Sequence, residues 1–267
     1  LTTFGTTDGA GVPHVGGRPS GYLSVPAFSS LAHGYHLTFT DSGPNGGGGY
    51  INQFTMILDV LLPEQLGWTA LFNTNPQNAN DADWYVDATG RLGIGELGYS
   101  SAGTVVANAW HRLAFAADLG AGIVTFYCNG LQVRHRTGAS LLDGRFSLYS
   151  NLDAGPDLLL FNEGDTSGTY THALHVSSIA FTDRTLSAGE IAALGGPRAE
   201  GIFARSLHAA WHGSEVVLTW SGATNVHLQR ASTLAPGEWR EVPDTMGASS
   251  HEEPVSGAAT FFRLIQQ

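Results

Sequence analysis

The stretch Trp110–Leu131, WHRLAFAADLGAGIVTFYCNGL, decides the fold. Apolar and other residues alternate over 113–117 and again over 124–128, which is the period-two pattern of half-buried strands. The glycines of Gly120–Gly122 permit the chain to reverse between these runs. Asn129–Gly130 is a strong hairpin signal at the end of the second run. The stretch therefore predicts two antiparallel strands of a larger sheet, with a further turn after them.

Short apolar or alternating runs recur along the first 181 residues, separated by clusters of Gly, Asn, Asp and Pro. Long stretches with a helical period are missing from this pattern, so the sequence predicts an all-β fold, a jelly-roll sandwich. The runs are Tyr35–Phe39, Phe54–Leu62, Ala70–Phe72, Trp84–Val86, Thr104–Ala107, Phe146–Tyr149, Leu158–Phe161 and Ala173–Phe181.

One short helix is predicted over Leu186–Gly195. Ser187 as N-cap and Glu190 three residues later form the pattern of a capping box, and Leu186 with Ile191 fits a hydrophobic staple. Gly195–Pro197 ends the helix, because glycine permits the left-handed cap and proline cannot continue it.

A linker over 196–201 is predicted to separate two domains, a jelly roll over 1–197 and a small β-sandwich over 198–267. The strands predicted for the second domain are Ser206–Trp211, Glu215–Trp220, Val226–Ala231, Trp239–Val242 and Ala259–Ile265.

The chain is acidic, with a formal net charge of -11, and all 12 of its basic residues are arginine. Without a basic stripe, nucleic acid is not an expected partner. No apolar run is long enough to insert into a membrane. The single cysteine, Cys128, is predicted to be a small buried hydrophobe rather than a nucleophile. Because the sequence begins at Leu1, without methionine or a signal peptide, we expect a mature or trimmed piece of a longer product.

Three segments of the first 200 residues resemble a laminin G-like domain of the concanavalin A-like lectin and glucanase superfamily. They are the Trp110–Gly130 hairpin, the segment Leu141–Leu148, and the strand Val176–Phe181 with the helix that follows it. Two further segments, Phe54–Asp59 and Asn78–Trp84, are similar to modules carried by secreted bacterial hydrolases, including phosphoesterases. The resemblance implies an accessory domain of a secreted or cell-surface bacterial protein.

The tail resembles a small fibronectin- or immunoglobulin-like module common at the C-termini of bacterial exported proteins. The residues that carry this resemblance are Val217–Trp220, Leu228–Ser232, Trp239 and Thr260–Leu264.

Two oxygen-rich loops, over 78–83 and 162–167, could hold Ca²⁺, which prefers six to eight oxygen ligands. The alternative is that their side chains only hydrogen-bond the local backbone, as in Asx turns. The candidate metal ligands are Asn80, Asp81, Asp83, Asn162, Glu163 and Asp165.

Aromatic side chains near predicted loops could stack on the flat C–H face of a sugar ring. The alternative is packing in the core or at its rim, which is the commoner role of aromatic residues in sandwiches. The candidate ligand-binding residues are Trp68, Trp84, Tyr85, Tyr99 and Tyr170. The Gly93–Gly98 stretch fits a GxGxxG dinucleotide pattern, but no helix follows it, so we interpret it as a turn.

Known catalytic patterns do not match the sequence. It contains no Gly-x-Ser-x-Gly elbow and no His-Glu-x-x-His metal motif, and nothing in it corresponds to the Glu-x-Asp-x-x-Glu of related glucanases. His172 and His175, three residues apart on a predicted strand, are expected to face opposite sides, which disfavours a shared metal.

The favoured hypothesis is a non-catalytic accessory module that binds a polysaccharide or cell-surface glycan. An attached hydrolase domain is the second expected partner. The alternatives are a glycoside hydrolase or polysaccharide lyase of the same superfamily with an unrecognised active site, and a structural or adhesive surface protein.

Overall fold

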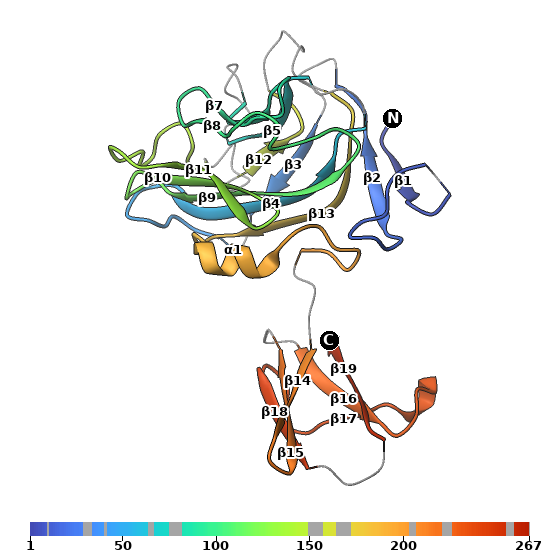
Figure 1. Ribbon diagram of the computed structural model, residues 1–267. Coiled ribbons are helices and arrows are strands. Elements are labelled where there is room, and N and C mark those ends of the chain that lie inside the picture. The colour runs from blue at the N-terminus through green and yellow to red at the C-terminus, as the bar shows by residue number, and fades with distance from the viewer. Residues whose placement is uncertain are drawn as a thin grey trace. The chain divides into compact units, whose positions relative to one another are not determined.

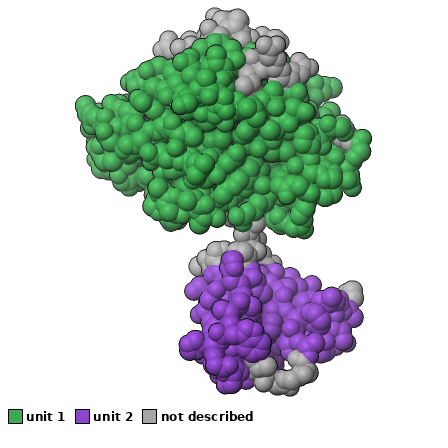
Figure 2. Space-filling view, in the orientation of Figure 1, with its two compact units in different colours: residues 1–203 green, residues 204–267 purple. Residues whose placement is uncertain are grey.

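The computed structural model describes residues 1–9, 11–28, 34–39, 42–63, 67–74, 82–148, 157–163, 172–202, 207–220, 226–254 and 259–266. The chain divides into two compact units, Leu1–Phe203 and Ala204–Gln267, which Figure 2 colours separately. None of the helices in these ranges combines the length and the apolar character that crossing a membrane requires.

Unit 1 is a sandwich of two antiparallel sheets, which confirms the predicted all-β jelly-roll fold (Figure 1). The seven-stranded sheet has the order β1 (Thr3–Thr6), β2 (Gly21–Val25), β13 (Leu174–Thr182), β4 (Gln53–Leu61), β9 (Trp110–Asp118), β10 (Ile123–Cys128) and β11 (Leu131–Arg136). The six-stranded sheet has the order β3 (Tyr35–Thr38), β12 (Asp157–Leu160), β5 (Thr69–Asn73), β6 (Trp84–Val86), β7 (Leu92–Ile94) and β8 (Gly98–Tyr99).

The hairpins predicted from the stretch 110–131 are present as β9, β10 and β11. Asn129 and Gly130 have φ of 52° and 82°, so both central residues of the second turn adopt the positive φ of a type I′ hairpin. The prediction that β9 is half-buried is wrong, since Arg112 and Ala114 on its other face are each only 1% exposed.

Aromatic rings fill the space between the two sheets. The Phe115 ring of the seven-stranded sheet lies 4.9 Å from the Phe72 ring and 5.7 Å from the Trp84 ring of the six-stranded sheet, measured between centroids. Edge-to-face packing of this kind contributes beyond the burial of area. The core therefore holds the two sheets in a fixed relation.

The helix α1 (Ala188–Leu194) covers the part of the outer face of the seven-stranded sheet formed by β4, β9 and β10, which is why β9 is buried on both sides (Figure 1). Both hydrogen bonds of the predicted capping box, between Ser187 and Glu190, are present, and Gly195 caps the end with φ of 61°. Ile191 packs on Ala114 and Ala116, whose small side chains allow the helix to approach the sheet.

The segment after α1 also packs on unit 1. Ile202 joins the cluster beneath the helix, Ala199 O accepts a hydrogen bond from Ser20, and Gly201 O accepts one from Arg112. The unit boundary consequently lies after Phe203, beyond the boundary at residue 197 expected from the glycine- and proline-rich composition.

Two predicted strands are not formed. Thr104–Ala107 is irregular: Val105 is fully buried and donates its N–H to Gly90 O, whereas Val106 is 47% exposed. In Phe146–Tyr149, Leu148 makes only an isolated bridge to Ile51, and Tyr149 lies outside the described residues.

Unit 2 has two three-stranded antiparallel sheets, one strand of which, β18 (Ser250–Pro254), was not among the predicted strands. One sheet has the order β14 (Leu207–His212), β15 (Glu215–Trp220) and β18 (Ser250–Pro254). The other has the order β17 (Arg240–Glu241), β16 (Val226–Ala231) and β19 (Phe261–Gln266), with the short 3₁₀ helix η1 (Pro236–Glu238) before β17. Leu218, Trp220 and Leu228 form the centre of its core.

Candidate functional site

Side chains of strand β6 point alternately into the core and toward the outer face of the six-stranded sheet. The outer face is the one turned away from the seven-stranded sheet. Trp84 points inward, because its ring contacts Phe115 and Phe126. Alternation along the strand places the flanking residues Asp83, Tyr85 and Asp87 on the opposite side. The outer face of the six-stranded sheet therefore carries both carboxylates and Tyr85.

Three of the predicted ligand-binding aromatic residues meet on this face. The Trp68 ring lies 5.9 Å from the Tyr85 ring and 6.1 Å from the Tyr99 ring, both edge-on. Pairing of Tyr85 and of Tyr99 with Gly93 places the two tyrosines in one row across β6, β7 and β8. We call Trp68, Tyr85 and Tyr99 the aromatic corner; Trp68 and Tyr99 are partly exposed, and Tyr85 is 3% exposed.

Gly67 and His172 fix the backbone of Trp68. A ring nitrogen of His172, Nδ1, lies 2.7 Å from the Trp68 carbonyl oxygen. A Cβ added at Gly67 would lie 2.3 Å from His172 Nε2, so a larger residue here would force the His172 ring to move. His175 lies elsewhere, against Tyr22 at 4.7 Å between ring centroids. His172 and His175 thus contact different residues, Trp68 and Tyr22.

Asp87 holds Arg91 beside the aromatic corner. Its Oδ1 accepts hydrogen bonds from Thr89 N, Thr89 Oγ1 and Arg91 N at 2.8–2.9 Å, and its Oδ2 accepts one from Arg91 Nε at 2.6 Å. Burial opposes ionisation, but these hydrogen bonds outweigh it and lower the pKa of Asp87 below its ordinary value. The Arg91 guanidinium carbon lies 4.9 Å from the Tyr99 ring centroid.

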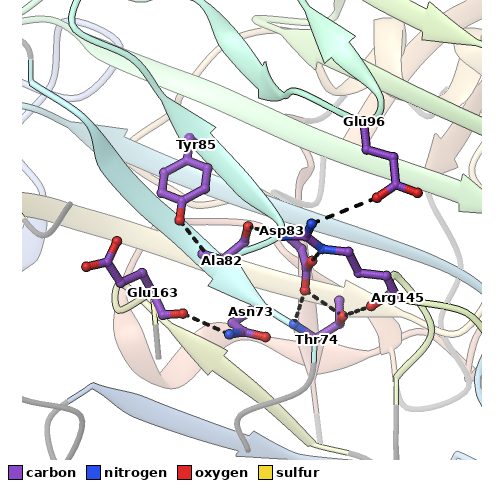
Figure 3. A network of polar contacts seen from close by, with 8 residues as sticks. All are labelled: Asn73, Thr74, Ala82, Asp83, Tyr85, Glu96, Arg145 and Glu163. Atoms are coloured by element: carbon purple, nitrogen blue, oxygen red, sulfur yellow. Dashed lines mark hydrogen bonds and ion pairs between the residues drawn. The ribbon is translucent and has the colours of Figure 1, made fainter. Parts of the chain in front are cut away.

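Asp83 forms a second acid–arginine pair at the other end of β6 (Figure 3). Its Oδ1 accepts a hydrogen bond from Arg145 Nε at 2.7 Å, and its Oδ2 accepts bonds from Thr74 N and Oγ1 at 2.8 and 2.7 Å. Burial raises the pKa of Asp83, and the hydrogen bonds from Thr74 and Arg145 oppose that rise. Arg145 also lies 3.8 Å from the carboxylate of Glu96, on the turn between β7 and β8.

This geometry corrects the prediction that Asp83 is a calcium ligand. The side chain is 0% exposed, and both of its oxygens already accept hydrogen bonds, one of them from a guanidinium cation. A cation placed against these oxygens would have to displace Arg145 and leave its charge without a counter-ion. Asp83 therefore belongs to an ion pair. Asn80 and Asp81, the other candidates of that loop, lie outside the described residues.

The second predicted calcium loop is described only up to residue 163. Asn162 and Glu163 are 3% and 0% exposed, and the Glu163 carbonyl oxygen accepts a hydrogen bond from Asn73 Nδ2 at 2.9 Å. Asp165 lies outside the described residues. Among the described residues, no group of three His, Cys, Asp or Glu side chains is placed to hold a metal. Calcium binding by this loop stays a prediction.

The prediction that Trp84 contacts a ligand is wrong, and the alternative of core packing holds for it. Its side chain is 0% exposed and is enclosed by Phe72, Phe115 and Phe126. Tyr170, the fifth aromatic candidate, lies outside the described residues.

Cys128 and the GxGxxG stretch behave as interpreted from the sequence. Cys128 is 6% exposed, and burial raises the pKa of its thiol to about 11, which disfavours the reactive thiolate. Its sulfur lies 3.6 Å from His111 Nδ1. Burial lowers the pKa of His111, so the pair is not a thiolate–imidazolium couple. Gly93–Gly98 is the turn of the β7–β8 hairpin.

A groove of about 560 Å³ opens elsewhere, between β2 and β13. Pairing of these strands ends at Leu23 and Val176, and beyond that point Gly21 and Tyr22 line one side while Ser177 and Ile179 line the other. None of the lining residues is acidic, so the groove offers no carboxylate pair for hydrolysis.

Arg91 and Arg145 were not among the residues predicted from the sequence. Asp87 is followed by Thr89 and Arg91, a spacing in which a carboxylate caps its own turn, and this signal was available. Arg145 is 62 positions from Asp83, so only the fold brings the two together.

Comparison with protein-family models gives no match, and comparison with curated proteins gives none. Among solved structures, the chain is similar to domain 4 of AbnA, an extracellular arabinanase from Geobacillus stearothermophilus, in complex with arabinotriose. The identity is 14%, the match covers 72% of this chain and 81% of that chain, and the TM-score is 0.42. It is similar to the SAP-like pentraxin from Limulus polyphemus, with 16% identity, coverage of 64% and 79%, and a TM-score of 0.42. It is also similar to the CBM40 module of a Ruminococcus gnavus sialidase bound to sialyllactose, with 14% identity, coverage of 61% and 96%, and a TM-score of 0.42.

Proposed function

We propose that unit 1 is a non-catalytic module that binds a polysaccharide or cell-surface glycan through the outer face of the six-stranded sheet. The observation that carries this proposal is the aromatic corner with a partly exposed arginine on its flank. An aromatic ring offers a flat apolar surface to the C–H face of a pyranose, while arginine N–H groups suit its hydroxyl oxygens. Trp68 and Tyr99 provide the rings, and Arg91 provides the donors.

The state of the nearby carboxylates supports binding without turnover. Retaining glycosidases need two carboxyl groups about 5 Å apart, one of which transfers a proton. Asp83 and Asp87 are 0% and 1% exposed, and each is occupied by an arginine and by backbone N–H groups. Such groups position other side chains. A glycoside hydrolase or polysaccharide lyase is therefore the second choice.

The proposal extends the laminin G-like resemblance to the context of the chain. We place the module in a secreted or cell-surface bacterial protein, beside a hydrolase domain on the same polypeptide. Binding would hold that enzyme at its polymeric substrate and raise the effective concentration of the substrate. Unit 2, with its fibronectin- or immunoglobulin-like resemblance, would act as a spacer or docking element.

A glycan array followed by calorimetry tests this function. The whole chain should bind at least one polysaccharide or surface glycan, and Trp68→Ala should weaken that binding at least tenfold. The matched control is Trp211→Ala, because Trp211 is 72% exposed on unit 2 and should leave affinity unchanged.

Two results would contradict the proposal. One is the failure of every glycan to bind. The other is product formation from a bound glycan that is abolished by a single substitution, which would identify an enzyme instead.

A further inference from the structure

Arg91 is held in one orientation before any ligand arrives. Its Nε donates to Asp87 Oδ2 at 2.6 Å, its backbone N–H donates to Asp87 Oδ1 at 2.9 Å, and its guanidinium lies over the Tyr99 ring. Charge-assisted hydrogen bonds and cation–π contacts restrict an otherwise flexible side chain. A ligand that binds this arginine would meet a group already positioned, so it would lose less rotamer entropy on binding.

The terminal nitrogens of Arg91 remain available. The side chain is 41% exposed, and within the described part of the chain only Nε has a hydrogen-bond partner. Arg134 is similar, since its Nε donates to Leu97 O on the same β7–β8 hairpin and its terminal nitrogens have no partner in the described part of the chain. Unlike Arg91, Arg134 forms no ion pair there. Two guanidinium groups thus flank the edge strand β8.

We propose that Trp68, Tyr99 and Arg91 bind a pyranose that carries a carboxylate, that is, a uronic acid unit of an acidic polysaccharide. This inference rests on the proposed function and narrows its ligand. The two terminal nitrogens of arginine match the two oxygens of a carboxylate, so that two parallel bonds form, and the opposite charges add an attraction that a neutral hydroxyl lacks.

The charge of the chain makes this local arrangement selective. The net charge of -11 repels an acidic polymer from most of the surface, but charges more than about 8 Å away are largely screened at physiological salt. Binding should therefore be confined to places where arginine is close. Arg91 forms such a place, because its guanidinium lies beside the Tyr99 ring of the aromatic corner.

The experiment compares each acidic ligand with its neutral counterpart. Calorimetry with the whole chain uses oligogalacturonate and oligoglucuronate, each beside the same oligosaccharide with its carboxyl groups reduced to alcohols. At least one acidic form should bind at least tenfold more tightly than its reduced counterpart, and added salt should weaken only the acidic form. Arg91→Gln should remove this preference because the positive charge is lost, and Arg91→Lys should reduce it because an ammonium cannot form the two parallel bonds.

Control variants separate this effect from misfolding. Arg240→Gln on unit 2 should leave both affinities unchanged, and Arg91→Gln should keep the affinity for the reduced form. Equal affinity for acidic and reduced forms, or equal losses for both in Arg91→Gln, would overturn the carboxylate inference while leaving glycan binding intact. Binding of no glycan of any kind would overturn the proposed function as well.

Discussion

Arg112 and Asp59 form a bidentate ion pair on adjacent strands, β9 and β4, beneath α1. Arg112 Nε donates to Asp59 Oδ1 and Arg112 Nη2 donates to Asp59 Oδ2, each at 2.7 Å, and the side chains are 1% and 0% exposed. Arg112 Nη1 also donates to Leu194 O, at the last residue of α1. The pair thus joins the seven-stranded sheet to the helix that covers it.

Removing one partner of this pair should be strongly destabilising. Asp59→Asn leaves the Arg112 cation buried without a counter-ion, which costs about 3–5 kcal/mol of the free energy of unfolding. Urea denaturation, followed by circular dichroism, measures the change. The control is Glu200→Gln, which breaks the exposed pair with Arg18 and should cost less than about 1 kcal/mol. A cost for Asp59→Asn as small as that of the control would show that water reaches the pair.

The capping box of α1 should make part of the stability depend on pH. Hydrogen bonds from Ser187 and Arg184 lower the pKa of Glu190 from 4.5 to about 2. A carboxylate with a lowered folded-state pKa stabilises the fold above its unfolded pKa, and this contribution is lost as pH falls toward the folded value. Wild type should therefore melt at a higher temperature than Glu190→Gln at pH 6, and the two curves should converge between pH 4.5 and 2.

Ser187→Ala should lower the free energy of unfolding by about 1 kcal/mol at neutral pH, because the helix loses its N-cap acceptor. A constant difference between wild type and Glu190→Gln from pH 6 to pH 2 would exclude the carboxylate as the source of the effect.

The Cys128 thiol should be unreactive in the folded protein. Burial raises its pKa to about 11, and the thiolate is the species that reacts with disulfide reagents. At pH 8, 5,5′-dithiobis(2-nitrobenzoate) should label the unfolded chain within minutes and the native chain only at the rate of its opening. Fast labelling of the native protein would mean that the β9–β10 region opens more readily than its burial implies.

Local patterns were sufficient to predict the central hairpin and the helix, whereas the site depends on distant residues. The type I′ turn at Asn129–Gly130 and the Ser187–Glu190 capping box each follow from neighbours in sequence. The burial of Arg112 depends on α1, which begins 76 residues later and is packed there by the fold. A half-buried strand and a fully buried one look alike when small alanines line the second face.

The candidate site shows the same limit. Period-two alternation is enough to place Trp84 and Tyr85 on opposite faces of the sheet. Both were nevertheless predicted as ligand-binding aromatic residues near a loop. Asp83 was interpreted from the composition of its loop as a cation ligand, and the actual cation is the guanidinium of Arg145, brought in by the fold. An oxygen-rich loop sequence therefore predicts that a carboxylate binds a cation, but it does not predict which cation.

Calcium binding by the loop 162–165 is tested by removing the metal. If this loop holds calcium, chelation should lower the melting temperature of the whole chain, since a ligand that binds only the folded state stabilises it. Glu163→Gln should abolish that response, because calcium prefers charged oxygen ligands. Asp83→Asn should keep the response while lowering stability, because Asp83 neutralises Arg145 rather than a metal. An unchanged melting temperature on chelation, with no calcium found by elemental analysis, would remove calcium from the account of this protein.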